Sequence, residues 1–114
     1  MDLKSDDYSI WYNPATQTVT CRGTLRLSEL EEYTLLVELL NDVIAQKPCR
    51  LTLDLRDLRF LNSSGFNVLS KFVLQVRQVE TIEFVIQSAQ NIPWHQRSLK
   101  NLQRLMPSLQ LLCD

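Results

Sequence analysis

Two adjacent serines, Ser63 and Ser64, occupy the place in the chain where chemistry is easiest to position. They follow a segment rich in aliphatic and charged residues, 50–62, and precede a stretch of helical periodicity. A hydroxyl at a helix N-terminus lies beside unpaired amides and the positive end of the helix dipole, both of which favour negative charge. The spacing predicts that the helix would tolerate a phosphate on Ser63. The alternative is that Ser63 or Asn62 only caps the helix.

Other reactive groups are few. Asp54 and Asp57 suggest a carboxylate pair or a magnesium site, but arginines in the same segment favour solvated, charge-paired acids. His95 is the single histidine, has no Ser or Cys partner nearby in sequence, and is interpreted as a surface or capping residue. A small enzyme using these three residues is therefore the weakest hypothesis. Three widely spaced cysteines predict reduced thiols rather than a disulfide framework or a zinc site.

The composition limits the possible functions further. The 114 residues are 45% hydrophobic with a formal net charge of −1, which indicates a folded domain without the basic excess of a nucleic-acid binder. Two glycines are too few for a dinucleotide fingerprint or a phosphate-binding loop. No apolar run approaches the roughly 20 residues of a membrane span. We therefore expect a cytoplasmic protein with no cofactor, no nucleic-acid partner and no membrane insertion.

The elements that must position the serines follow from periodicity and turn residues. We expect a frayed start at 1–7, strands at 9–12, 16–22, 50–55, 81–86 and 109–113, helices at 29–46, 64–77 and 93–106, and a loop at 56–62. A turn at 13–15 joins the first two strands, and a capping box at Ser28 and Glu31 opens the first helix. Strands alternating with helices imply parallel pairing. The predicted fold is a single α/β domain over 1–114, with a mixed, mostly parallel sheet of about five strands and its helices mainly on one face.

Side-chain spacing also predicts the core and two surface features. The core is expected to include the residues Leu36, Leu40, Leu53, Leu69 and Val73. Phe72 and Leu74 cannot both be buried beside Val73, so one is expected to be exposed near the binding face. The third helix is basic through Arg97, Lys100 and Arg104, which indicates a solvated face or, alternatively, a docking patch for an acidic partner.

The serine segment resembles the anti-sigma factor antagonist (STAS) family. In that family an aliphatic strand leads through an Asp-containing segment to Asp-Ser-Ser/Thr-Gly at the start of a helix. The matching residues are Leu51-Thr52-Leu53-Asp54-Leu55, Leu58, Phe60 and Asn62-Ser63-Ser64-Gly65. The element order and the chain length also match, and the resemblance implies a STAS-like fold. The sequence departs from the pattern at Asn62, where the family has Asp.

The resemblance implies a regulatory binding module rather than an enzyme. Ser63 would be the phosphate acceptor, with Ser64 as second choice, for a partner serine kinase or anti-sigma factor of the histidine-kinase-like ATPase fold. A metal-dependent phosphoserine phosphatase would reverse the modification, and the unphosphorylated form would bind the partner. The partner surface would comprise Asn62, Ser63, Ser64, Gly65 and Asp57, with Gly65 allowing close backbone approach. The alternative is a STAS-like scaffold or ligand-binding subunit that is not phosphorylated and docks a transporter or an enzyme.

Overall fold

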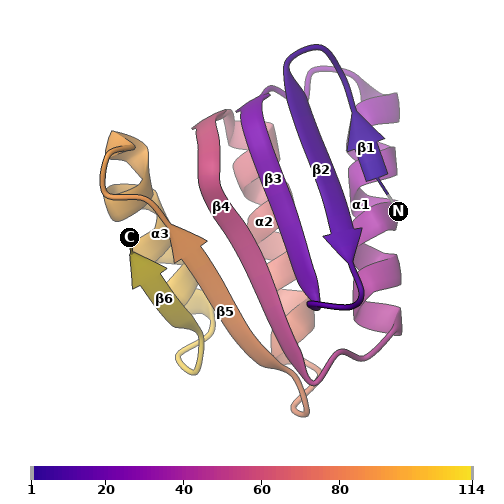
Figure 1. Ribbon diagram of the computed structural model, residues 1–114, viewed down its shortest axis with the longest axis vertical. Helices are drawn as coiled ribbons and strands as arrows, with labels where there is room; N and C mark the ends of the chain where they lie inside the picture. The colour runs from indigo at the N-terminus through magenta and orange to yellow at the C-terminus, as the bar shows by residue number, and fades with distance from the viewer. Residues whose placement is uncertain (1, 114) are drawn as a thin grey trace.

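The computed structural model describes residues 2–113, which form one α/β domain (Figure 1). Met1 and Asp114, the ends of the predicted domain, lie outside the described residues. The elements in chain order are β1 (Asp2–Lys4), β2 (Tyr8–Asn13), β3 (Thr18–Leu25), α1 (Leu30–Ala45), β4 (Arg50–Leu61), α2 (Ser63–Arg77), β5 (Glu83–Ser88), α3 (Pro93–Leu105) and β6 (Gln110–Cys113). The six strands lie side by side in the same order as in the sequence.

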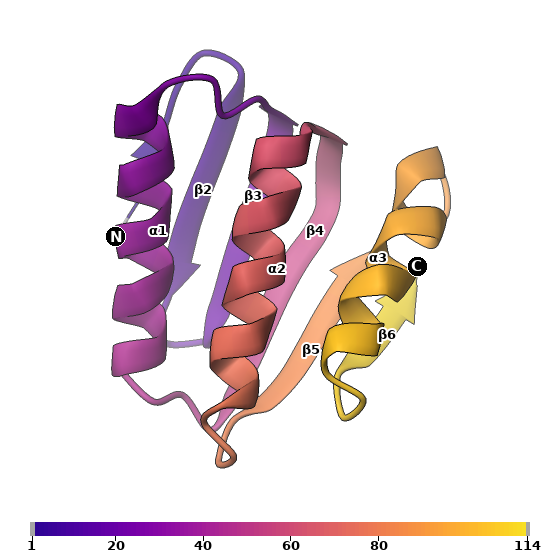
Figure 2. The same cartoon turned by 180° about the vertical axis from the view of Figure 1, so that it is seen from behind.

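The sheet is mixed, as predicted. Strands β1, β2 and β3 pair antiparallel, whereas β3, β4, β5 and β6 pair parallel. Parallel neighbours arise because each helix returns the chain to the start of the next strand. All three helices lie on one face of the sheet, and no helix covers the other face within residues 2–113 (Figures 1 and 2). The predicted fold class is thus confirmed, with six strands in place of about five.

The extra strand is β1, and it corrects the expectation of a frayed start. Asp2, Leu3 and Lys4 pair antiparallel with β2, with Asp2 opposite Trp11. Leu3 packs against the hydrophobic core, which anchors a segment whose other residues are mostly polar. A three-residue edge strand that carries charged side chains is a common way to end a sheet, because it discourages further pairing.

Strand β4 is the second correction, because it continues through the predicted loop at 56–62. This twelve-residue strand pairs with β3 from Thr18 opposite Thr52 to Leu25 opposite Leu61, with register shifts after Thr20 and after Gly23. Gly23 has a φ of 91°, and a Cβ there would lie 2.2 Å from the Asp7 carbonyl oxygen. The bulges let charged residues of β4 remain exposed while the strand continues, so the charges that suggested a loop belong to an irregular strand.

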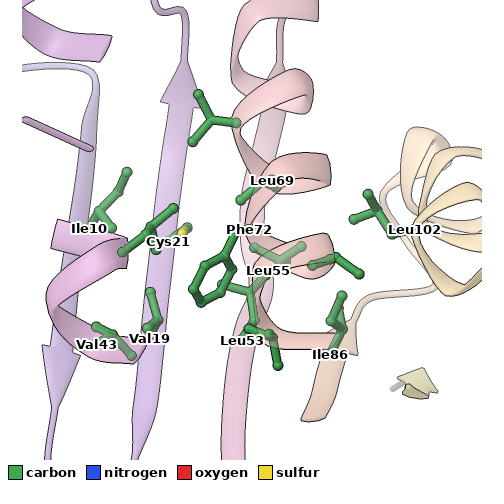
Figure 3. Close-up of a cluster of buried hydrophobic side chains, with 14 of the residues drawn as sticks. Ile10, Val19, Cys21, Val43, Leu53, Leu55, Leu69, Phe72, Ile86 and Leu102 are labelled. Atoms are coloured by element: carbon green, nitrogen blue, oxygen red, sulfur yellow. The ribbon is translucent and has the colours of Figure 1, made fainter. Parts of the chain in front are cut away.

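The core lies between the sheet and the helices (Figure 3). The five core residues predicted from the sequence are all at most 2% exposed. Phe72 of α2 contacts Phe84 of β5 edge to face, with ring centroids 5.7 Å apart. Leu74, by contrast, is exposed, which confirms that one of the two apolar residues flanking Val73 faces solvent. It lies eleven residues beyond Ser63, roughly 16 Å along the helix, so its expected place near the serines is wrong.

The helix starts differ in how they are capped. The expected capping box at Ser28 and Glu31 is not formed: α1 begins at Leu30, and its cap residue Glu29 makes no side-chain capping hydrogen bond. Helix α1 is instead tied to the sheet by the Tyr8 hydroxyl, which donates to a Glu32 carboxylate oxygen at 2.7 Å. The bond lies next to the N-terminal turn of α1 and fixes that turn against β2.

Candidate functional site

The three helices all begin at one end of the domain, beyond the carboxyl ends of the parallel strands (Figure 2). Ser63 is the first residue of α2 and follows β4 by a single residue. The sequence predicted that Ser63 lies at this end, where the functional side chains of parallel-sheet folds collect. The structure therefore puts the serine pair at the end of the domain where all three helices begin.

Asn62 is the cap of α2. Its Oδ1 atom accepts hydrogen bonds from the Gly65 amide at 2.9 Å and from the Leu27 amide at 3.3 Å. Its own amide donates to the Leu25 carbonyl oxygen at 3.2 Å. One side chain thus closes the first turn of α2 and holds the connection between β3 and α1 against it.

Because Asn62 caps α2, the Ser63 side chain does not. The residue is exposed, and its hydroxyl makes no hydrogen bond to any residue within the described range 2–113. Ser64 is half-buried. Of the two hydroxyls, that of Ser63 is the more accessible to an enzyme that would modify it.

Gly65 has a role within its own chain. It is buried, and a Cβ at this position would lie 2.4 Å from Leu61 Cδ1 and 3.3 Å from Asn62 Oδ1. The glycine thus makes room for the end of β4 and for the capping side chain. Its expected role as the point where a partner backbone approaches stays a prediction.

The two aspartates lie in β4, each beside an arginine. Asp54 receives two hydrogen bonds from the Arg56 guanidinium, at 3.0 and 2.9 Å, and one from its amide. Burial alone would raise the pKa of Asp54, but these hydrogen bonds and the charges of Arg56 and Arg22 hold that pKa below its usual value. Asp57 is exposed, and its Oδ2 atom lies 3.7 Å from Arg22 Nε. It does not line the cavity between α2 and α3 that is described below. Within residues 2–113, no group of His, Cys, Asp and Glu could hold a metal ion.

His95 is buried, which corrects its interpretation as a surface or capping residue. It has no exposed surface and joins two segments of the core. Its Nδ1 atom accepts from the Ala89 amide at 3.0 Å, so Nε2 carries the proton and donates to the Leu58 carbonyl oxygen at 2.9 Å. Burial lowers the pKa of His95, and the bond to Leu58 offsets only part of that effect. The residue is a neutral structural link, with both ring nitrogens occupied.

A cavity of about 210 Å³ lies beside Ser63, between the first turns of α2 and α3. It is lined by Leu61, Asn62, Ser63, Phe66, Trp94 and Ser98. The sequence interpretation missed the contributions of Phe66, Trp94 and Ser98. Trp94 and Ser98 of α3 lie at least 30 positions beyond the serines in sequence, and only the return of the chain through β5 brings them close.

Two exposed apolar side chains lie at the same end of the domain. Leu30, the first residue of α1, is 81% exposed, and Phe60 near the end of β4 is 41% exposed. The Arg26 guanidinium lies over the Phe60 ring, 4.9 Å from its centroid. We call this end of the domain, which carries Leu30, Phe60, Ser63 and Trp94, the helix-start surface. It combines exposed apolar groups with a free hydroxyl.

The fold is similar to solved structures of known proteins. The chain aligns over its full length with 99% of a chain in the crystal structure of the diguanylate cyclase SiaD in complex with its activator SiaC from Pseudomonas aeruginosa, with a TM-score of 0.78 and 9% identity. It also aligns over its full length with 98% of apo-SiaC from the same organism, with a TM-score of 0.67 and 13% identity. At these identities the likeness establishes the fold alone. No family model and no curated protein sequence matches the chain.

None of the helices among residues 2–113 has the length and hydrophobicity needed to cross a membrane.

Proposed function

We propose that this chain is a protein-binding regulator that docks a partner enzyme through the helix-start surface and is switched by phosphorylation of Ser63. The observation that carries the proposal is the free, exposed Ser63 hydroxyl at the first position of α2, next to a cap supplied entirely by Asn62. Exposed apolar side chains at the same end, Leu30 and Phe60, supply the contact area that protein partners use.

A phosphate at Ser63 would act on the partner rather than on the fold. It adds about −1.5 to −2 charges, and the N-terminus of α2 favours negative charge by about 0.3–1 kcal/mol. The first turn of α2 contains no acidic residue to repel it. A docked partner, however, would have to desolvate the phosphate, so the phosphorylated chain would release the partner.

The likeness to SiaC supports the regulatory class of this proposal. SiaC is described as the activator of a diguanylate cyclase, an enzyme, and its fold is similar to that of this chain over 98% of its length. We propose that the partner of this chain is likewise an enzyme whose activity it changes. The resemblance to the STAS family adds a serine kinase and a metal-dependent phosphatase as the proteins that would add and remove the phosphate.

The same geometry supports a chain that performs no catalysis itself. Asp54 is hydrogen-bonded to Arg56, Asp57 lies beside Arg22, and both ring nitrogens of His95 are occupied inside the core. Each of the three residues that a small enzyme would have used thus has a structural partner of its own.

The test is a comparison of partner binding by wild type, Ser63→Ala and Ser63→Asp. The partner is first captured with the wild-type chain in the cells that make it, and the captured chain is digested to find the phosphorylated peptide. Calorimetry is then expected to give similar affinities for wild type and Ser63→Ala, and at least tenfold weaker binding for Ser63→Asp, about 1.4 kcal/mol.

The control is Thr81→Asp, which adds the same charge at an exposed site in the turn between α2 and β5, far from the start of α2. It is expected to leave the affinity unchanged. Equal affinities for all four proteins, with no phosphate on the peptide containing Ser63, would reject the switch and favour the unmodified scaffold.

A further inference from the structure

The three helices differ sharply in charge. Helix α1 contains four acidic residues and no basic one, whereas α2 and α3 together contain five basic residues and no acidic one. The basic residues are Lys71, Arg77, Arg97, Lys100 and Arg104, and all five are exposed. Lys71 lies beside α1, where its Nζ atom donates to the Tyr33 hydroxyl at 3.2 Å, so the positive surface of this protein, whose net charge is only −1, lies mainly over α3.

On α3, the positive charges share one face. Arg97, Lys100 and Arg104 are spaced three and four residues apart, which places them on one side of the helix. None of the three forms an ion pair with an acid among residues 2–113. The residues that α3 turns toward the sheet are instead apolar or neutral, including Leu99 and Leu102. These charges are therefore available to a partner.

The cavity beside Ser63 opens on the same helix pair. Its aromatic wall is held in place, because the Trp94 indole N–H donates to the Arg59 carbonyl oxygen at 2.9 Å and the ring lies against His95 with centroids 4.3 Å apart. At about 210 Å³, the space is smaller than the roughly 300–1,000 Å³ of most small-molecule sites. It suits a single apolar side chain, of the kind that anchors protein interfaces.

We infer that the α2–α3 face docks an acidic amphipathic segment of the partner protein. One apolar side chain of that segment enters the cavity between Phe66 and Trp94, and its carboxylates face Arg97 and Lys100. The inference rests on the proposed function and names the chemistry of the partner. Complementary charge sets the register of such an interface and speeds its association.

This docking also gives a physical reason for the switch. Ser63 lines the cavity that the apolar anchor enters. A phosphate there adds about −1.5 to −2 charges at the opening and reduces the positive potential of the α2–α3 face. An acidic segment would then meet like charge at its point of insertion, whereas a basic segment would be attracted.

A nucleic acid is a less suitable occupant of this face. Domains that bind nucleic acid typically carry a basic excess, and this chain has 12 Lys and Arg residues against 13 Asp and Glu residues. An acidic protein segment needs only a local patch with an apolar anchor point. The α2–α3 face supplies both.

The experiment uses the full chain and a phage-displayed library of random sixteen-residue peptides as the probe. The enriched peptides are expected to carry Asp or Glu on both sides of a Leu, Phe or Trp. A synthetic peptide of the enriched sequence, chosen without Trp, is then titrated into the Trp11→Phe variant, in which Trp94 is the remaining tryptophan. Binding is expected to change the emission of Trp94, because the anchor fills the cavity beside it.

Two pairs of variants locate the peptide. The double variant Arg97→Glu with Lys100→Glu is expected to weaken binding at least tenfold, whereas Lys4→Glu with Lys47→Glu, which changes the net charge equally, is expected to change it less than twofold. Ser98→Phe, which fills the cavity, is expected to abolish the emission change, whereas Ser98→Ala preserves it. Thermal unfolding of each variant checks that it is folded.

The inference is overturned by enrichment of basic or uncharged peptides, by no enrichment, or by binding that neither Arg97→Glu with Lys100→Glu nor Ser98→Phe weakens. These outcomes differ from failure of the proposed function. If the natural partner responds to Ser63→Asp but not to the α3 charge reversal, the switch stands and this docking surface is wrong. If it responds to the charge reversal but not to Ser63→Asp, the surface stands and the switch is wrong.

Discussion

The side-chain oxygen of Asn62 accepts the amide of Gly65 at 2.9 Å, and this bond closes the first turn of α2. Asn and Asp cap helices about equally well. Asn62 therefore supplies the cap that an Asp could supply, without a negative charge beside Ser63. A phosphate on Ser63 would meet less repulsion here than beside an aspartate.

This capping bond leads to a stability prediction for Asn62. We expect Asn62→Ala to lower the free energy of unfolding by about 1–2 kcal/mol, because both the Gly65 and the Leu27 amide lose their acceptor. Asn62→Asp keeps the acceptor and is expected to stay within about 0.5 kcal/mol of wild type. Urea unfolding followed by circular dichroism measures both.

Ser63→Ala is the matched control, because the Ser63 side chain bonds to no residue within 2–113. We expect it to change the stability by less than about 0.5 kcal/mol. A larger loss from Ser63→Ala than from Asn62→Ala would show that Ser63, and not Asn62, caps α2.

Much of the fold could be predicted because local patterns and tertiary packing agree. Helices α2 and α3 begin and end within one residue of their predicted bounds, since capping and proline residues mark their starts. The second half of β4 could not be predicted. Its charged residues are typical of a loop, and only its pairing with β3 across two register shifts makes it a strand.

The candidate site was predictable to the extent that it is local. Ser63 and Asn62 lie together in sequence at a strand-to-helix junction, and the structure places them there. Trp94 and His95 are adjacent in sequence, yet one lines the cavity and the other is buried. Which side of α3 faces the sheet depends on packing against β4 and β5, and the sequence pattern around a lone histidine does not determine it.

Leu53 tests the placement of β4 in the centre of the sheet. It has no exposed surface and lies in the core between the sheet and α2 (Figure 3). We expect Leu53→Ala to cost about 2–5 kcal/mol of unfolding free energy, the range for deleting a buried leucine side chain. Leu74→Ala, at a leucine that is 40% exposed, is the control and is expected to cost less than about 1 kcal/mol. Urea unfolding compares the two, and similar losses would contradict the assignment.

The three cysteines are expected to react in two classes. Cys49 and Cys113 are exposed, whereas Cys21 is buried. Burial, and then the charge of Asp54, raises the pKa of Cys21 to about 12, so its thiolate is scarce at neutral pH. Ellman's reagent is expected to label two thiols rapidly in the native protein and all three in guanidinium chloride. Three fast thiols in the native state would show that the Cys21 region of β3 is open.

His95 predicts how the stability depends on pH. The folded protein holds this side chain neutral, because Nδ1 accepts the Ala89 amide and burial lowers the pKa. The unfolded chain protonates the same histidine with a pKa near 6.5. Below that pH the unfolded state therefore binds one more proton than the folded state, which favours unfolding. Above that pH the histidine is neutral in both states, and the stability no longer depends on its titration.

We therefore expect the free energy of unfolding to be constant between about pH 7.5 and 7 and then to fall as the pH drops through 6.5, by at most about 1.4 kcal/mol per pH unit. The lowered pKa of Asp54 has the same sign, but its contribution is lost only in more acidic solution. His95→Gln keeps a donor and an acceptor without a titrating group, so its stability is expected to be nearly flat between pH 7.5 and 5.5. Urea unfolding of both proteins at these two pH values makes the comparison. Parallel losses in wild type and His95→Gln would place the titrating group elsewhere and would contradict a buried neutral histidine at the junction of Leu58 and Ala89.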